Sequence, residues 1–92
     1  MPHASPDPAL SLTVRGLREA RGLTREAMAM RVGVTLGTLA RIELAQAAPS
    51  WDTFRRIACA LELSISELSL AIEATEPATL DRSPSIGARN RP

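Results

Sequence analysis

The chain has 92 residues, enough for one small domain, and its formal net charge at pH 7 is only +1, which excludes a polybasic nucleic-acid binder. Its single cysteine excludes a disulfide within the chain. The sequence offers neither an apolar run of membrane-spanning length nor the apolar region of a signal peptide, so we expect a cytoplasmic protein. Both ends are rich in Pro, Ser and Ala. We therefore expect a disordered N-terminal arm at 1–9 and a disordered C-terminal tail at 75–92 around a folded domain at 10–74.

Apolar residues recur every three or four positions through the central part of the chain, which predicts helices and no strands. The first helix is expected to contain Leu12 and to end near Gly22, a residue that suits a left-handed C-terminal cap. Thr24 is then placed to cap a second helix that continues to about Val32, where Gly33 ends it.

Three further helices follow with the same spacing. Their expected N-terminal caps are Thr35, Ser50 and Ser64. Ser64 and Glu67 together match the capping box, in which each side chain bonds the other residue's backbone N–H. The inner faces are predicted to hold Leu39 and Ile42, then Trp51, Phe54, Ile57, Ala58 and Leu61, then Ile65, Leu68 and Ile72. Five short helices joined by short loops predict a compact all-α bundle.

The strongest local pattern is a helix, a three-residue turn and a second helix, in the stretch TREAMAMRVGVTLGTLARIE. Gly33 can take the positive φ that ends the first of these helices, and Val34 can fill the corner between them. The small Ala29 permits the two helices to approach closely. Such a motif makes its second helix protrude from the surface, where it can enter a DNA major groove.

Further residues extend this pattern along the chain. They are Leu17, Arg21-Gly22-Leu23-Thr24, Met28-Ala29, Val32-Gly33-Val34-Thr35, Thr38-Leu39, Arg41-Ile42-Glu43, Pro49-Ser50, Ile57-Ala58, Ala60-Leu61, Leu63-Ser64 and Glu67-Leu68. With this ordered set, residues 17–68 resemble the phage Cro/repressor-type (Xre-like) helix-turn-helix family. The resemblance implies a five-helix lambda-repressor-like domain that binds double-stranded DNA sequence-specifically, usually as a homodimer on a palindromic operator. The third helix, at about 35–44, would enter the major groove.

The resemblance also implies which residues contact DNA. They are Thr24, Arg25, Thr35, Leu36, Gly37, Thr38, Arg41 and Gln46. Arg25 stands where the family commonly has a Gln that touches phosphate, and it can make that contact with a full charge. On the third helix, Leu36 can contact only a thymine methyl and Gly37 has no side chain. Arg41 alone can make the bidentate guanine contact, worth roughly 1–3 kcal/mol.

Two departures from the family concern backbone conformation and phosphate binding. The loop after the third helix has Ala45 and Gln46 where the family often has Gly and a basic residue, so we expect weaker phosphate binding, from Gln46 and nearby backbone N–H groups. Glu62 stands where the family often has a helix-ending Gly, and a positive φ there would cost about 1 kcal/mol.

The family also suggests a structural salt bridge between Arg18 of the first helix and Glu43 at the end of the third. We expect it to hold the third helix against the bundle, so that Glu43→Ala lowers the melting temperature by several degrees. Cys59 is expected to be a small core residue, because it has no Cys or His partner at metal-binding spacing.

The last helix carries more apolar surface than one buried stripe requires, in Leu68, Leu70 and Ile72. These residues either pack under the first helix or form a dimer seam, and we slightly favour the seam. Either arrangement is compatible with a regulator that acts as a dimer.

Two other functions stay open beside that of a DNA-binding transcriptional regulator. The presumed DNA face is made apolar by Leu36, Gly37, Ala40, Leu44 and Ala45. Such a face would suit a protein-interaction module with a degenerate DNA face. An antitoxin-like regulator would bind both DNA and a partner protein. An enzyme is not expected, because the only histidine is His3 in the N-terminal arm and no catalytic triad can form. We likewise expect no metal, no cofactor and no small-molecule effector domain.

Overall fold

The computed structural model describes residues 6–80, and side chains as far as residue 77. This part of the chain forms five helices and no strands: α1 (Pro8–Ala20), α2 (Arg25–Val32), α3 (Leu36–Glu43), α4 (Trp51–Ala60) and α5 (Ile65–Leu80). The prediction of an all-α bundle of five helices is therefore confirmed.

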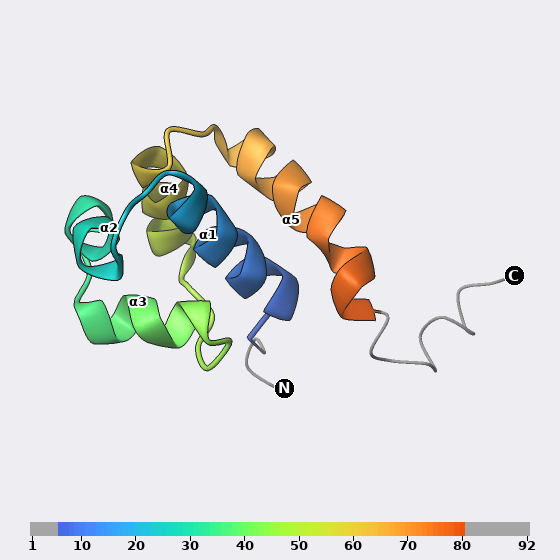
Figure 1. The fold of residues 1–92 in the computed structure, drawn as a ribbon, viewed down its shortest axis with the longest axis horizontal. Coiled ribbons are helices and arrows are strands. Elements are labelled where there is room, and N and C mark those ends of the chain that lie inside the picture. The colour runs from blue at the N-terminus through green and yellow to red at the C-terminus, as the bar shows by residue number, and fades with distance from the viewer. Residues whose placement is uncertain (1–5, 81–92) are drawn as a thin grey trace, which may run out of the picture.

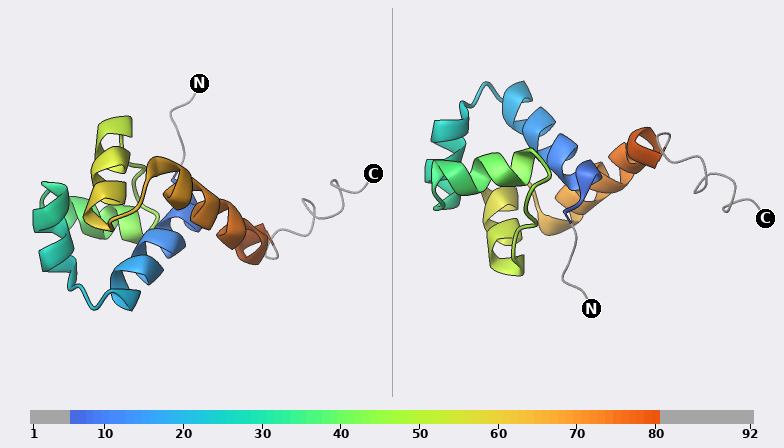
Figure 2. Two further views of the ribbon diagram at one scale, coloured as in Figure 1. Left: turned by 90° about the horizontal axis from the view of Figure 1, so that it is seen from above. Right: turned by 90° about the horizontal axis from the view of Figure 1, so that it is seen from below.

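Figure 1 and Figure 2 show how the five helices are arranged. α1 packs against both α5 and α3, while α2 packs against α3 and α4. The pair α2 and α3 lies at one end of the molecule, and the C-terminal part of α5 extends at the other. α3 runs along an edge of the bundle, with its outer side open to solvent (Figure 1). Within residues 6–80, no helix is long and apolar enough to cross a membrane.

The helix ends follow the predicted capping residues. The side-chain oxygens that accept a backbone N–H from the first turn belong to Thr24, Thr35 and Ser50, at 3.0–3.1 Å. The capping box is complete, because Glu67 Oε1 accepts from the Ser64 N–H at 2.8 Å and Ser64 Oγ accepts from the Glu67 N–H at 3.0 Å. Gly33 ends α2 with a φ of 86°, in the left-handed region.

The expected start of the domain at residue 10 was too late. α1 begins at Pro8, because Asp7 caps it: Asp7 Oδ1 accepts from the N–H groups of Ala9 at 3.0 Å and Leu10 at 3.4 Å. Proline suits the first position of a helix, where its missing N–H would have no partner. Ala9 is 1% exposed and belongs to the core.

The expected end of the domain at residue 74 was too early, because α5 continues to Leu80. Thr75 Oγ1 accepts a hydrogen bond from Thr13 Oγ1 of α1 at 2.7 Å and donates one to the Ala71 carbonyl at 2.9 Å. This link between the first and last helices orders a segment whose composition is typical of a tail. The remaining parts of the predicted arm and tail, 1–5 and 81–92, lie outside the described residues.

Every helix contributes to one apolar core. Its largest wholly buried side chains are Val14, Met28, Val32, Leu39, Ile42, Ile57, Leu61 and Leu68. The prediction that Cys59 is a core residue was wrong, because Cys59 is exposed to solvent. α4 turns its Ile57 and Ala58 side inward, and two positions beyond Ile57 the helix faces the opposite way. Trp51, also expected inside, is 64% exposed.

The three apolar residues proposed as a dimer seam do not share a surface. Leu68 is 0% exposed and Ile72 is 8% exposed, and both belong to the core of this one chain. Leu70 is 63% exposed on the other side of α5. The prediction of a common seam was therefore wrong, and only Leu70 is left for a partner to contact.

Candidate nucleic-acid interface

The turn between α2 and α3 has the geometry that the sequence predicts. The carbonyl of Ala29 accepts both the Gly33 N–H at 2.8 Å and the Val34 N–H at 3.1 Å, which closes the end of α2. Thr35 then begins α3 by capping the N–H of Thr38. Because Ala29 is small and only 4% exposed, α3 can pack closely against α2.

α3 has one buried side and one exposed side. Leu39, Ile42 and Glu43 are buried, whereas Leu36, Gly37 and Arg41 are exposed. An α-helix with its side chains is about 10–12 Å across, and a DNA major groove is about 12 Å wide. The exposed side of α3 thus has the size and accessibility that groove binding requires.

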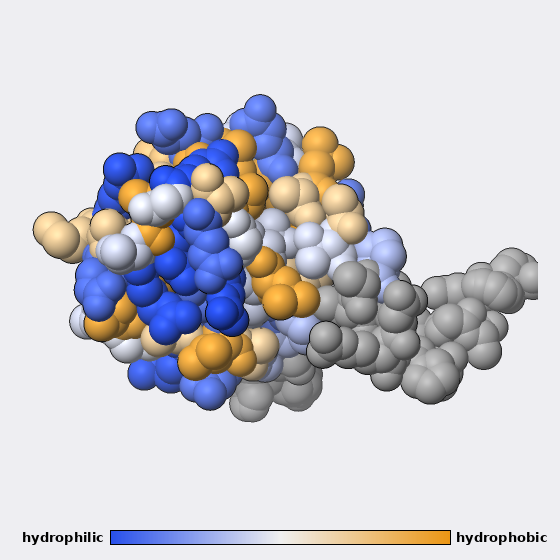
Figure 3. Space-filling model, viewed as in Figure 1, coloured by the Kyte–Doolittle hydropathy of each residue, from blue (hydrophilic) through white to orange (hydrophobic). Residues whose placement is uncertain are grey.

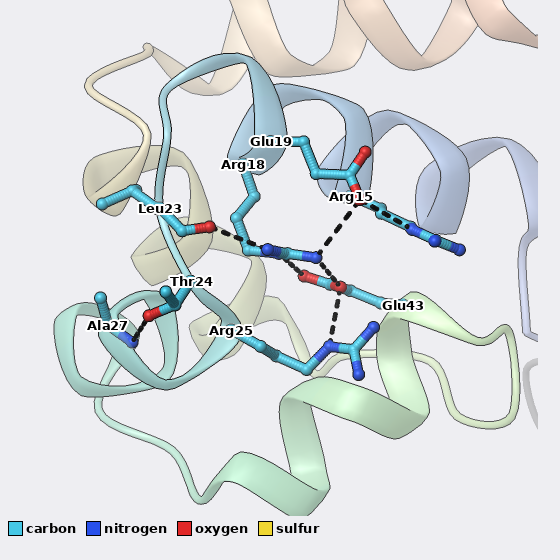
Figure 4. A network of polar contacts seen from close by, with 8 residues as sticks. All are labelled: Arg15, Arg18, Glu19, Leu23, Thr24, Arg25, Ala27 and Glu43. Atoms are coloured by element: carbon cyan, nitrogen blue, oxygen red, sulfur yellow. Dashed lines mark hydrogen bonds and ion pairs between the residues drawn. The ribbon is translucent and has the colours of Figure 1, made fainter.

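The predicted bridge between α1 and α3 is confirmed (Figure 4). Arg18 Nε donates to Glu43 Oε2 at 2.8 Å and Arg18 Nη2 donates to Glu43 Oε1 at 3.1 Å, while Arg18 Nη1 donates to the Leu23 carbonyl at 2.8 Å. The Glu43 side chain is 0% exposed. Its hydrogen bond raises the pKa of Arg18 above the ordinary value, so the guanidinium stays charged.

A second arginine, missed by the sequence analysis, shares the same carboxylate. Arg25 Nε donates to Glu43 Oε1 at 3.1 Å, and the Arg25 side chain is 31% exposed. Figure 4 shows the terminal nitrogens of Arg25 directed away from Arg18. Arg25 thus donates one N–H to Glu43, and within residues 6–77 its terminal N–H groups make no hydrogen bond. The sequence carried one signal for this second contact: Arg18 and Arg25 lie on two different helices, and the single Glu43 carboxylate can accept from both.

The threonine hydroxyls predicted to contact DNA also serve the helix ends. Thr24 Oγ1 accepts from the Ala27 N–H, which leaves its own proton free to donate. Thr35 Oγ1 accepts from the Thr38 N–H and donates to Thr38 Oγ1 at 2.9 Å. Of this pair, only Thr38 keeps a hydroxyl proton for an outside acceptor.

The residues of α3 that were expected to face the bases are exposed to solvent. Arg41 is exposed, and within residues 6–77 its side chain has no hydrogen bond or ion pair. Its Nη1 lies 3.9 Å from the point that a Cβ on Gly37 would occupy. Leu36, at the start of the helix, is 43% exposed. The structure brings these three residues onto one open surface.

The loop after α3 is less able to bind phosphate than expected. Ala45 has a φ of 59°, a left-handed conformation that costs a non-glycine residue roughly 1–2 kcal/mol. The Ala45 N–H donates to the Ile42 carbonyl at 3.2 Å, and the Gln46 N–H donates to the Arg41 carbonyl at 2.8 Å. These backbone donors are already used, so the exposed Gln46 side-chain amide is the remaining donor of this pair.

The surface around the interface mixes polar and apolar areas. Figure 3 shows a broad hydrophilic area on the side where α1 ends and α2 lies, and hydrophobic atoms along the edge where α3 runs. Leu36 and Leu44, at the two ends of α3, are 43% and 50% exposed. The candidate interface is therefore not a uniformly charged surface.

A separate apolar groove lies where the starts of α1 and α4 meet α5. Its volume is about 450 Å³ and it is lined by Asp7, Leu10, Ala48, Pro49, Ser50, Trp51, Phe54 and Ser69. The Trp51 and Phe54 rings stack with their centroids 5.8 Å apart. Its one carboxylate, Asp7, already caps α1. Among residues 6–77, no cluster of His, Cys, Asp and Glu could hold a metal ion.

Comparison with known proteins places this geometry in a family. Residues 9–71 match the model of a helix-turn-helix domain. Among solved structures, the restriction-modification controller protein C.AhdI from Aeromonas hydrophila shares 28% identity over 66% of this chain and 92% of its own, with a TM-score of 0.64. An HTH_3 family transcriptional regulator from Vibrio cholerae shares 32% identity over 82% of this chain, with a TM-score of 0.66, although the match spans only 40% of that regulator.

The clp gene regulator ClgR from Corynebacterium glutamicum shows the same fold at 20% identity, over 99% of this chain and 100% of its own, with a TM-score of 0.73. A search of curated proteins found no match. The family model covers most of the chain, including both helices of the turn and the buried bridge that supports them. The chain therefore belongs to the helix-turn-helix domain family.

Proposed function

We propose that this protein, a DNA-binding transcription regulator by fold and family, inserts α3 into the major groove of an operator and acts as a homodimer. The observation that carries the proposal is the arrangement of α3. Its inner side is fixed by the buried Glu43, and its outer side presents an exposed arginine, Arg41, without a partner in residues 6–77. In this role the protein acts by binding rather than by catalysis.

Phosphate contacts would come from the start of α2 and from the edges of α3. Thr24 caps α2 and Arg25 is its first residue, at the positive end of the helix dipole, and they would donate to phosphate through the Thr24 hydroxyl proton and the Arg25 terminal N–H groups. Thr38 and the Gln46 amide add neutral donors. With so few anchors, we expect roughly three to five phosphate contacts per protomer and a shallow dependence of affinity on salt.

Selection of bound duplexes from a random pool at low salt tests the proposal directly. Recovery of a palindromic sequence would support both DNA reading and a homodimer, because operator symmetry mirrors the symmetry of the protein. Arg41→Ala should then weaken the recovered site. Arg55→Ala is the matched control, because it also removes one exposed arginine but from α4, outside the turn. Failure to recover any duplex at micromolar protein would refute the proposal.

The homodimer must use a surface other than the predicted seam. Leu70 on α5 and Trp51 on α4 are the exposed apolar side chains of these two helices, at 63% and 64%. We expect Leu70→Ser to shift the sedimentation of the protein from dimer to monomer without unfolding it. A dimer that survives this change and Trp51→Ser would place the contact elsewhere.

The second candidate, a protein-interaction module or an antitoxin-like regulator with a protein partner, rests on Leu36 and Leu44. Both are exposed apolar residues on the α3 side. If Leu36→Glu abolishes binding of a purified partner while DNA binding is unchanged, the surface of α3 serves a protein. If Arg41→Ala abolishes DNA binding, α3 reads DNA.

A further inference from the structure

The exposed side of α3 carries a single charged residue. Of the eight positions from Leu36 to Glu43, only Arg41 and Glu43 are ionisable, and Glu43 is buried in its bridge. Arg41 stands in the last turn of the helix. In the helix-in-groove geometry, the N-terminal residues of the recognition helix reach the base edges, so a side chain in the last turn must reach back toward them.

Gly37 makes this reach easy. It lies four positions before Arg41 and therefore on the same side of the helix, one turn closer to the N-terminus. Long helical side chains lean toward the N-terminus and cover the preceding turn. The guanidinium of Arg41 does so here, since its Nη1 lies 3.9 Å from the position of an ideal Cβ on Gly37. That distance is an ordinary van der Waals contact, so a methyl group would fit and a longer side chain would compete for the same space.

We propose that Gly37 determines DNA specificity because its missing side chain leaves the surface of the first turn of α3 open for the Arg41 guanidinium to occupy. This inference rests on the proposed function. The missing side chain at 37 is then not a lost reading residue. It lets one arginine replace two readers and makes one guanine the dominant base in each half-site. Leu36, beside it at the start of the helix, adds apolar contact for a thymine methyl.

The inference is tested with duplexes selected from a random pool by the full chain, followed by binding measurements on the selected site and on the same site with its guanine replaced. The wild-type protein should lose roughly 5- to 150-fold in affinity on that replacement. Gly37→Ala should keep this ratio, because a methyl group fits beside Arg41. Gly37→Leu should reduce it to the level of Arg41→Ala, and combining both changes should cause no further loss.

The two substitutions at 37 are chosen to preserve the helix. Ala and Leu both favour helix more than Gly, and the site is exposed, so circular dichroism and the melting temperature should show a folded protein in each case. Leu cannot hydrogen-bond a base and therefore adds no new reader of guanine. The guanine ratio, unlike overall affinity, does not respond to a general change of stability.

The outcomes separate the inference from the proposed function. If Gly37→Leu keeps the guanine ratio, or if Gly37→Ala loses it, the role of Gly37 is refuted while DNA reading by α3 stands. If the wild-type protein binds a selected duplex but ignores its guanines, Arg41 is not the reader and the inference fails. If the protein selects no duplex at all, the inference and the proposed function fail together.

Discussion

Replacing Glu43 with alanine should destabilise the domain far more than a typical surface change. The carboxylate is 0% exposed and accepts three hydrogen bonds, two from Arg18 and one from Arg25. Its removal leaves the Arg18 guanidinium nearly buried, at 9% exposure, and still charged, because arginine stays protonated at any ordinary pH; the half-exposed Glu19 carboxylate, 3.8 Å away, compensates it only weakly. Uncompensated buried charge is among the few causes of a large mutational effect.

The expected magnitude follows from measured losses of one partner in a buried pair. Such losses cost roughly 3–5 kcal/mol. For a domain of this size each kcal/mol lowers the melting temperature by about 4–8 °C, so Glu43→Ala should lower it by roughly 12–40 °C. This is larger than the several degrees expected from the sequence, because the nearly complete burial of the Arg18–Glu43 pair was not foreseen. A domain with a stability near 5 kcal/mol would keep only about 0–2 kcal/mol.

Thermal unfolding followed by circular dichroism measures the effect. Arg15→Ala provides the control, since the Arg15–Glu19 pair is 48% and 55% exposed at 3.2 Å and should contribute only about 0.3–0.5 kcal/mol. Glu43→Gln keeps the size of the side chain and should destabilise as well, because a neutral amide cannot balance Arg18. If Glu43→Ala melts within about 4 °C of the wild type, the bridge does not hold α3 in place and the reasoning is wrong.

Substitutions at Leu68, Leu70 and Glu62 test the packing and the backbone, and the reactivity of Cys59 tests its exposure. In dilute solution, Leu68→Ala should lower the free energy of unfolding by about 2–5 kcal/mol and Leu70→Ala by less than about 0.5 kcal/mol, as measured by urea titration; equal losses would contradict their assignment to core and surface. Glu62→Gly should raise that free energy by about 0.5–1 kcal/mol, because Glu62 has a φ of 62°, and a lower urea midpoint would argue against strain there. Cys59 should react with a thiol reagent in the native protein about as fast as in urea, and strong protection would mean that it is buried after all.

The starts of the last four helices and the turn between α2 and α3 were predictable because their signals are local. A Thr or Ser cap is recognised within three residues of the N–H that it binds, and the capping box of Ser64 and Glu67 satisfies both partners within one turn. Gly33 marks a positive φ at one position. These interactions depend only on residues that lie within a few positions of one another in the sequence.

The N-terminal end of the domain also has a local signal, the Asp7 cap followed by Pro8, which the prediction overlooked, but its C-terminal end was not predictable in the same way. α5 extends past residue 74 because Thr75 bonds Thr13, which lies on another helix. Composition alone made 75–80 resemble a tail. The error at Cys59 has a different cause: free cysteine is usually buried, but helical periodicity puts position 59 on the side of α4 that carries Asp52 and Arg55.

Within the candidate site, the family pattern gave the positions and the structure gave the connections. Arg18 with Glu43 was expected as a pair, but Arg25 joins it from a third helix. The bond from Thr35 to Thr38 likewise depends on rotamers that sequence does not specify. Both findings change which donors remain for DNA, and neither changes which surface faces it.

The buried bridge at Glu43 fixes the rotation of α3, on which the proposed selectivity of its exposed side depends. Contacts of Leu39 with the core are non-directional, and they would tolerate a small rotation of the helix about its axis. The bidentate bonds from Arg18 to Glu43 are directional, so they fix that rotation. Arg41 lies two positions before Glu43, and a rotation that weakened the bridge would move its guanidinium off any base edge that it contacts. We therefore expect Arg18→Lys, which keeps the charge but cannot make the paired bonds, to reduce guanine discrimination even at temperatures where the domain remains folded.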